Sequence, residues 1–464
     1  MNQNLTLKFS YGTLEITASR EQITPIKDYV YFDNRTNCYR AKASDYGEIA
    51  LTLHRQKIAY TDNAKNFQPI QNLKLKTNFT PRGHQLEALN AWKNNFYSGV
   101  VVLPTGSGKS FLAILAMHTI KRPTLIIVPT IDLLQQWVTQ LEEFFNIPIG
   151  MLGGGSNDIQ LITVSTYDSA VLRMEFIGDK FGLIVFDECH HLPGNVNRSA
   201  ALMSIAPFRL GLTATPERND DGESLLYQLI GPKIYELHID ELAGEILAPY
   251  ETRQIFTHLT DEETFHYIKN REIYTNFLKY HRINFKKQND WNKFIGLCAR
   301  TPEGRKVFKA YHNQKKIAAG SQQKLAKLWQ IIQYHPGERI IIFTADNETA
   351  YNIAETLFLP IITYRTKAAE RKDILQKFRE GKYQLLVTSK VLNEGVDVPE
   401  ASVGVIISGS GSIREHVQRL GRILRSREGK NAILYEIISK NTAEFYVSKR
   451  RREHRAYKNN INFK

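Results

Sequence analysis

The chain has 464 residues, of which 42% are hydrophobic, and its formal net charge is +14. This length predicts two or three domains, because one hydrophobic core rarely serves more than ~250–300 residues. No apolar run approaches the roughly 18 residues of a membrane helix, and the first residues lack the pattern of a signal peptide. We therefore expect a cytoplasmic (nucleoid-associated) or nuclear protein with no membrane partner. The positive charge favours a polyanionic partner such as nucleic acid.

The three cysteines, Cys38, Cys189 and Cys298, lie far apart in the sequence. Without a close pair they argue against a disulfide framework, a zinc site and an iron–sulfur cluster.

Residues 1–77 contain short amphipathic segments, such as Gly12-Thr-Leu-Glu-Ile-Thr17, in which apolar and polar residues alternate. Alternation of this kind is typical of half-buried strands. We predict a small α+β domain here, and it carries no catalytic signature.

A phosphate-binding loop is predicted at Leu103-Pro-Thr-Gly-Ser-Gly-Lys-Ser110, between apolar runs at 100–103 and 111–117. In the order strand, loop, helix, backbone N–H groups can cradle a triphosphate, Lys109 can reach the β and γ oxygens, and Ser110 can ligate Mg²⁺. The alternative is a glycine–serine turn beside an exposed lysine, and Leu103 stands where the usual motif has glycine. The residues expected to hold the nucleotide are Thr105, Gly106, Ser107, Gly108, Lys109 and Ser110.

Two carboxylates, Asp187 and Glu188, follow the apolar run at 181–186. Asp187 can hold the same Mg²⁺ as Ser110, and Glu188 can orient and deprotonate the attacking water. Alone, such a pair is more often the charged first turn of a helix. Its combination with the lysine loop favours the catalytic interpretation.

These two segments resemble motifs I and II of the superfamily-two helicases and translocases. Six further segments resemble the remaining motifs in the expected order, at 128–137, 164–167, 212–216, 340–345, 387–399 and 418–425. Segments 79–85, 361–366 and 408–415, with the full run at 387–399, resemble the XPB-like helicases of excision repair. The resemblance implies an ATP- and Mg²⁺-dependent DNA helicase or translocase with 3′ to 5′ polarity and a role in repair.

The resemblance also implies the fold: an α/β protein of two RecA-like motor domains with parallel sheets flanking an ATP cleft, a small N-terminal α+β domain and a helical insertion. Strand patterns, such as those at 124–128 and 208–212, alternate with helix patterns in both halves, which favours parallel sheets. The expected domains are a damage-recognition-like domain (1–77), a first motor domain (78–245), a linker with a basic thumb-like insertion (246–330) and a second motor domain with a basic tail (331–464).

The resemblance places further residues at the nucleotide. It implies that Gln418, Arg422 and Arg425 act in catalysis, although arginines at this spacing could instead form a solvated helix face. Gly395 and Asp397 are expected to couple the nucleotide to the DNA side. Arg82 and Gln85 are expected to grip the adenine, since an amide can donate and accept at once. Polar caps of a helix N-terminus are nearly as good an interpretation of that pair.

DNA contacts are expected from polar residues of the motifs and from the insertion. Aromatic residues of segment 262–316 can stack on bases while lysines meet phosphates, or they can form a small core of the insertion's own, which we favour for most of them. The expected contacts are Thr130, Ser165, Thr166, Arg218, Asp220, Lys286, Lys287, Lys293, Thr344, Arg365, Thr388 and Ser389. Such contacts read the backbone rather than the base sequence.

The expected DNA partner is a junction of single strand and duplex, and some relatives work with a nuclease or repair protein. Family members carry Arg-Glu-Asp after the third motif, where this chain has Arg218-Asn219-Asp220, which puts strand separation in doubt. Two alternatives therefore stay open: a double-strand translocase of a restriction or defence complex, and a nucleotide-gated DNA-binding scaffold with little turnover.

Overall fold

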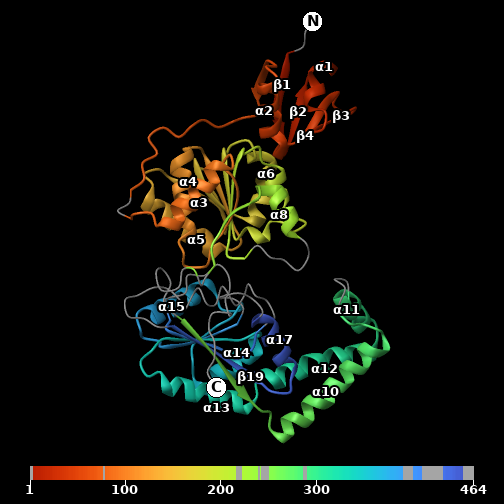
Figure 1. Cartoon of the computed structure of the whole chain (residues 1–464), viewed down its shortest axis with the longest axis vertical. Coiled ribbons are helices and arrows are strands. Elements are labelled where there is room, and N and C mark those ends of the chain that lie inside the picture. Colours follow the sequence, from red (N-terminus) through yellow and green to blue (C-terminus); the bar gives the residue numbers. More distant parts are fainter. Residues whose placement is uncertain are drawn as a thin grey trace. The chain divides into compact units, whose positions relative to one another are not determined.

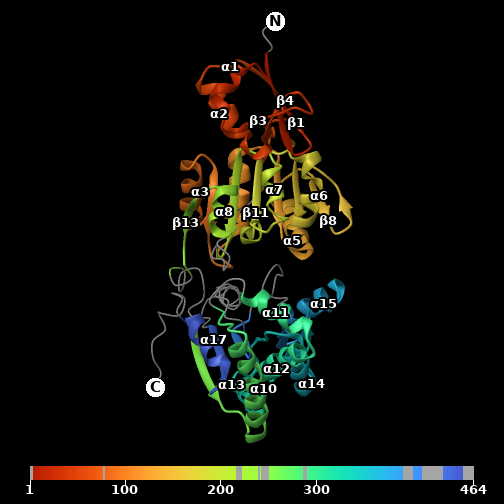
Figure 2. The same cartoon turned by 90° about the vertical axis from the view of Figure 1, so that its right-hand side faces the viewer.

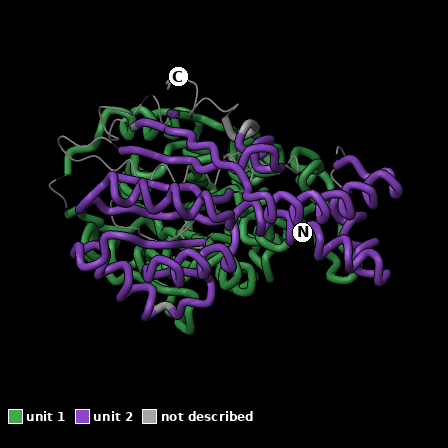
Figure 3. The backbone as a smooth tube through the Cα atoms, turned by 90° about the horizontal axis from the view of Figure 1, so that it is seen from below, with its two compact units in different colours: residues 1–237 green, residues 238–464 purple. Residues whose placement is uncertain are grey.

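The computed structural model describes residues 4–76, 79–215, 222–238, 241, 250–285, 290–389, 401–409 and 432–452. The chain divides into two compact units, residues 1–237 and residues 238–464 (Figure 3). Each unit has its own sheet or sheets and its own hydrophobic core.

The first unit begins with a small domain built on a five-stranded sheet in the order β3-β4-β2-β1-β5. Its elements are β1 (Leu5–Ser10), β2 (Thr13–Thr17), α1 (Arg20–Ile23), β3 (Val30–Asp33), β4 (Cys38–Lys42), α2 (Tyr46–Arg55) and β5 (Tyr60–Asn63). Alternate residues of β1 and β2 are buried, including Leu5, Leu7, Leu14 and Ile16. The predicted alternation therefore has a physical cause, because one face of this sheet packs on α2 and the other does not.

This small domain packs onto the rest of unit 1. Ile205, from the larger domain, belongs to the small domain's hydrophobic core. The N–H of Asn66 donates to the carbonyl of Asp179 at 3.0 Å, and the rings of Tyr11 and Phe176 meet edge to face.

The larger domain of unit 1 is an eight-stranded sheet in the order β13-β6-β12-β11-β7-β10-β8-β9, in which only the β8–β9 pair is antiparallel. Its strands are β6 (Ser98–Val102), β7 (Thr124–Val128), β8 (Ile149–Gly153), β9 (Ser156–Asn157), β10 (Ile162–Thr166), β11 (Leu183–Asp187), β12 (Phe208–Thr213) and β13 (Lys233–Glu236). Its helices are α3 (Gly83–Asn94), α4 (Lys109–Ile120), α5 (Ile131–Phe144), α6 (Tyr167–Ile177), α7 (Ser199–Leu202) and α8 (Gly222–Ile230).

Helices cover both faces of this sheet. Helices α3, α4 and α5 share one core with the sheet, and α6, α7 and α8 share another on the opposite face (Figures 1 and 2). Strands buried on both sides are continuous apolar runs; all five residues of β7 are buried.

The second unit contains a six-stranded parallel sheet in the order β14-β19-β18-β15-β17-β16. Its strands are β14 (Tyr250–Thr257), β15 (Ile340–Phe343), β16 (Ile361–Ile362), β17 (Leu385–Thr388), β18 (Val403–Ile406) and β19 (Ala432–Ser439). Helices α13 (Gln322–Tyr334) and α14 (Asn347–Leu357) pack on the sheet, and α15 (Ala368–Arg379) and α17 (Ala443–Arg452) complete the unit.

Strand β14 differs from the sequence expectation, which assigned residues 246–330 to a linker and insertion. It pairs with β19 along all eight of its positions, from Tyr250 to Thr257. Its sequence carries charged residues, Glu251 and Arg253, as is common on an edge strand whose free side is protected from further pairing. The second sheet therefore begins before the insertion rather than after it.

Three helices form the insertion between β14 and α13. Helices α10 (Asp261–Tyr280) and α12 (Pro302–Ala319) run side by side away from the second sheet, and α11 (Asp290–Arg300) packs at their far end (Figure 1). Their core contains Phe277, Phe294 and Val307. The interpretation that most aromatics form a small core is confirmed for Phe277 and Phe294, against which Tyr274 packs, while Phe265 and Tyr280 are exposed.

The predicted α/β class is confirmed, with two parallel sheets, a small N-terminal α+β domain and a helical insertion. Among the described residues no helix is long and apolar enough to cross a membrane.

Candidate nucleotide-binding site

The predicted phosphate loop joins the end of β6 to the first residue of α4 in unit 1. Gly106 and Gly108 both have φ of +87°, a conformation that glycine adopts without strain. A Cβ on Gly108 would collide with the amide nitrogen of Gln85. No side chain caps the N-terminus of α4, so its first N–H groups are suited to an anion.

Two residues of α3 hold this loop in place. Nε2 of His84 donates to the carbonyl of Ser107 at 2.9 Å. The Gln85 amide donates to the carbonyls of Ser107 and Gly108 at 3.3 and 3.2 Å, and its oxygen accepts from the N–H of Arg82 at 3.0 Å. Gln85 is buried, so both ends of its amide serve the loop and the helix start. Arg82 and Gln85 were expected either to grip the adenine or to cap a helix N-terminus, and the Gln85 side chain does cap the start of α3. His84 was not among the expected site residues.

Lys109 and Asp187 lie at the same edge of the first sheet. Strands β6 and β11 flank β12 in parallel, so their carboxyl ends point to one side. Nζ of Lys109 donates to the carbonyl of Leu103 at 3.1 Å. Burial raises the pKa of Asp187, although the indole of Trp137 and the charge of Lys109 act in the lowering direction. The structure therefore brings the loop lysine and the acidic strand end to the same edge of the sheet.

The Asp187 carboxylate is held at both oxygens. The indole N–H of Trp137 donates to Oδ2 at 2.8 Å, and the N–H of Glu188 donates to Oδ1 at 3.0 Å. The Tyr167 hydroxyl donates to the carbonyl of Asp187 at 3.3 Å. Trp137 and Tyr167 end the helicase-like segments at 128–137 and 164–167, and no local signal in the sequence points to Asp187 as their partner.

Glu188 has a left-handed backbone, with φ of 45° and ψ of 52°. A non-glycine residue in this region stores about 1–3 kcal/mol of strain and persists where the surroundings hold it. Its carboxylate lies 3.5 Å from Nδ1 of His190, which lies 3.1 Å from the hydroxyl of Thr213. The Thr213 carbonyl in turn accepts from the N–H of Leu103 at 2.9 Å. Motifs II and III and the phosphate loop are thus one connected network.

The residues present fit a magnesium-bound nucleotide. The Thr105 hydroxyl in the loop is buried and has no hydrogen-bond partner among the described residues, and Ser110 lies in the first turn of α4. Within the described part of the chain no three His, Cys, Asp or Glu side chains gather as a metal cage. Mg²⁺ in phosphate sites needs only one or two protein carboxylates in addition to the phosphate oxygens. Asp187 supplies one such carboxylate.

Three of the described residues of unit 1 were expected to contact DNA. Thr130 caps α5 and Thr166 caps α6, each accepting from a first-turn N–H. Ser165 is fully buried, and its hydroxyl donates to the carbonyl of Thr166. Because its hydroxyl is enclosed, Ser165 is not presented to a phosphate in this structure.

Four expected DNA contacts lie in the sheet domain of unit 2, outside the insertion. Thr344, Thr388 and Ser389 follow or end the neighbouring strands β15 and β17 and are all buried. The Thr344 hydroxyl donates to the carbonyls of Asp346 and Thr388. Arg365 is exposed and lies over the ring of Tyr364, so it is the member of the group most accessible to a phosphate.

Lys293, on α11, is exposed, and its amino group reaches the carbonyl of His281 at 3.5 Å. The other expected site residues lie outside the described residues: Arg218, Asp220, Lys286, Lys287, Gly395, Asp397, Gln418, Arg422 and Arg425.

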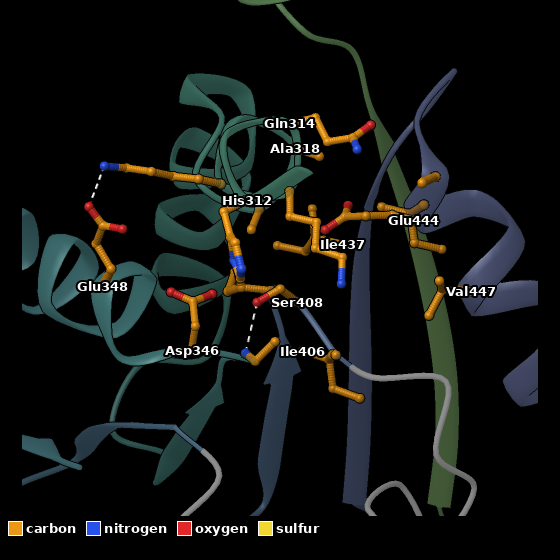
Figure 4. A pocket seen from close by; sticks show the side chains of 18 of the residues that line it. His312, Gln314, Ala318, Asp346, Glu348, Ile406, Ser408, Ile437, Glu444 and Val447 are labelled. Carbon is orange, nitrogen blue, oxygen red and sulfur yellow. Dashed lines mark hydrogen bonds and ion pairs between the residues drawn. The ribbon is translucent and has the colours of Figure 1, made fainter. Parts of the chain in front are cut away.

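A cavity of about 760 Å³ lies in unit 2, at the carboxyl ends of β15, β18 and β19 and against α12 and α17 (Figure 4). Its lining includes His312, Asp346 and Ser408, and the Ser408 hydroxyl accepts from the N–H of Ala345 at 2.9 Å. Burial and the charge of Lys315 lower the pKa of His312. All residues that line this cavity belong to unit 2.

Three family profiles match the chain. Residues 7–64 match the Xeroderma pigmentosum group B helicase damage recognition domain, and residues 298–458 match the ERCC3/RAD25/XPB C-terminal helicase. Residues 78–218 match the type III restriction enzyme, res subunit.

The chain is 40% identical over 423 residues to the DNA 3′-5′ translocase XPB2 of Sulfurisphaera tokodaii, an alignment covering 91% of this chain and 95% of that protein. It is 31% identical over 370 residues to the DNA 3′-5′ helicase XPB of Mycobacterium tuberculosis, covering 76% of this chain and 60% of that longer protein. Among solved structures, a point variant of S. cerevisiae Dbp5 bound to RNA and ADP BeF3 matches with a TM-score of 0.55 and 16% identity, covering 82% of this chain and 89% of that one. This last similarity shows the fold alone.

Proposed function

The chain belongs to the XPB family of DNA helicases and translocases, and from this premise we propose that it is an ATP-dependent motor that moves 3′ to 5′ on DNA in DNA repair. The two XPB profiles favour this activity over a translocase of a restriction complex, because the restriction profile covers residues 78–218 only.

One observation carries the proposal. Lys109, Asp187 and Glu188 lie at one edge of the first sheet, beside the N-terminus of α4, which no side chain caps. A DNA-binding scaffold with little turnover would need the phosphate loop but not a strained Glu188 held in the network of His190 and Thr213. The arrangement supports hydrolysis rather than binding alone.

In the proposed reaction the loop N–H groups and Lys109 hold the phosphates of ATP, with Ser110 and Asp187 placed to hold Mg²⁺. When bound, the ion would neutralise charge on the β and γ oxygens. Glu188 orients a water and takes its proton as the water attacks the γ-phosphate, and the bond from the γ-phosphorus to the bridging oxygen breaks to release ADP. We propose that Gln418, Arg422 and Arg425 stabilise charge on that phosphate and that Gly395 and Asp397 respond to it.

DNA is the proposed macromolecular substrate, at a junction of single strand and duplex. Proposed contacts to its backbone are Thr130, Ser165, Thr166, Arg218, Asp220, Lys286, Lys287, Lys293, Thr344, Arg365, Thr388 and Ser389. Of these, Ser165, Thr344, Thr388 and Ser389 are buried in this structure and would need a local rearrangement to reach a phosphate. We propose that residues 1–77, which contain the match to the damage recognition domain, serve as a damage-recognition-like domain. We also propose that a nuclease or repair protein is a partner, and that the protein acts where the chromosome lies, in the nucleoid or nucleus.

The test is ATP hydrolysis measured beside strand separation on single-stranded, forked and blunt duplex DNA. We expect magnesium-dependent hydrolysis that DNA stimulates strongly. Equal rates with and without DNA, in a folded preparation, would refute the motor.

Strand separation is a second outcome of the same experiment. The Sulfurisphaera relative is named a translocase and the mycobacterial relative a helicase, and Asn219 replaces an acid of the family pattern. A triplex-displacement assay is added to detect movement along duplex DNA. Displacement of the third strand without unwinding of the forked substrate would identify translocation alone. Unwinding of the forked substrate would show that strand separation does not require an acid at position 219.

A further inference from the structure

Two helices that start at proposed DNA contacts each send one aromatic hydrogen-bond donor to Asp187. Helix α5 starts after Thr130 and carries Trp137, and α6 starts after Thr166 and opens with Tyr167. Trp137 donates to the side chain of Asp187 at 2.8 Å, and Tyr167 donates to its main-chain carbonyl at 3.3 Å.

These contacts are buried and specific. Trp137 is 2% exposed, Tyr167 is 3% exposed and Asp187 is 6% exposed. Seven residues, or two helical turns of about 10 Å, separate Trp137 from Thr130. Each helix therefore connects its N-terminal threonine rigidly to the aspartate that is placed to hold Mg²⁺.

The carboxylate geometry depends on these donors. One N–H on each oxygen of Asp187, from Trp137 and from the Glu188 backbone, fixes the plane of the group. Each oxygen retains a second lone-pair direction for a metal or a water. A small displacement of α5 would turn that plane, because the indole ring is packed in the core of the domain.

We propose that Trp137 and Tyr167 are positioning residues that couple DNA bound at the N-termini of α5 and α6 to the orientation of Asp187, so that DNA and magnesium-bound nucleotide strengthen each other's binding. This inference rests on the proposed function and adds its route of regulation within unit 1. Coupling between two ligands is reciprocal, so DNA and the metal nucleotide must change each other's affinity by the same factor.

The experiment measures the affinity of a fluorescent, non-hydrolysable ATP analogue with and without Mg²⁺ and with and without single-stranded DNA. Trp137→Phe removes the N–H and keeps an aromatic ring. We expect it to reduce the gain in affinity that Mg²⁺ provides by about 10- to 100-fold, as loss of a partner to a metal ligand commonly does, while the metal-free affinity stays at the wild-type value.

Trp92→Phe is the matched control. Trp92 is equally buried in the same domain, and its indole N–H donates to a carbonyl, that of Arg209, at 2.9 Å. It loses the same kind of bond without touching Asp187, so we expect wild-type magnesium dependence. Tyr167→Phe removes a single oxygen and should lower the factor by which DNA strengthens nucleotide binding.

The inference is overturned if Trp137→Phe shows the same magnesium dependence as Trp92→Phe. It is also overturned if DNA strengthens nucleotide binding to Tyr167→Phe by the same factor as in the wild type. If Trp137→Phe fails to fold, the Tyr167→Phe result decides. Failure of the proposed function is recognised separately, because the wild-type protein would then show no DNA-stimulated hydrolysis.

Discussion

Substitution of Gln85 distinguishes two roles of this residue, recognition of adenine and support of the phosphate loop. If it reads adenine, Gln85→Ala should weaken ATP binding and leave GTP binding unchanged. In the structure both donors of its amide are occupied by the carbonyls of Ser107 and Gly108. We therefore expect Gln85→Ala to weaken ATP and GTP binding by the same factor, because the side chain acts through the loop that holds the phosphates.

The size of the effect follows from what remains after the substitution. Ser107 keeps the bond from His84 at 2.9 Å, and Gly108 keeps the bond from the N–H of Leu112 at 3.2 Å. Neither carbonyl is left unpaired, so the cost lies near the lower end of ~0.5–1.5 kcal/mol for each of the two bonds. A total of about 1–2 kcal/mol corresponds to roughly 5- to 30-fold in Kd.

The assay is competition of ATP and of GTP against a fluorescent nucleotide at fixed Mg²⁺. Gln85→Glu keeps the acceptor for Arg82 but turns an acceptor toward the two carbonyls, so it should lose more affinity than Gln85→Ala. Gln160→Ala, which removes an exposed contact to Asp158, is the control. An ATP loss more than about tenfold greater than the GTP loss would refute the loop role and establish adenine recognition.

Three further predictions concern turnover and stability. Glu188→Gln should keep ATP affinity and lower the DNA-stimulated kcat by about 10²–10⁴-fold, the contribution of a general base; an unchanged kcat would remove Glu188 from catalysis. Lys109→Ala should lower both ATP affinity and kcat, whereas Arg425→Ala should lower kcat by about 10³-fold or more with little change in Kd; a fully active Arg425→Ala protein would contradict its role at the γ-phosphate. Lys324 is fully buried and donates to Glu444 and to the carbonyl of Ile407, each at 2.6 Å. Lys324→Met should therefore lower the free energy of unfolding of unit 2 in urea by about 3 kcal/mol, and adding Glu444→Gln should restore part of it. An unshifted midpoint would show that the pair contributes nothing to stability.

Much of the fold could be predicted because its signals are local. The apolar segment 124–128 was predicted as a strand and is β7 with the same bounds, and 208–212 falls within β12. Burial on both faces of a parallel sheet requires such runs, so the pattern is visible without any partner strand. The phosphate loop was predictable for the same reason, since its strand, glycines and helix are consecutive in the chain.

Strand β14 and the contacts of Asp187 were not predictable in this way. An edge strand carries a weak pattern, and residues 250–257 become a strand only through pairing with β19, which lies some 180 positions later in the chain.

The sequence by itself therefore determined the fold class, the phosphate loop and the acidic strand end, because each depends on neighbours within a few residues. Only the tertiary structure decided that Gln85 supports the loop, that Ser165 is enclosed and that Trp137 holds Asp187 from 50 positions away. A hydrogen bond between distant residues depends on where two elements pack, and no local periodicity records that position.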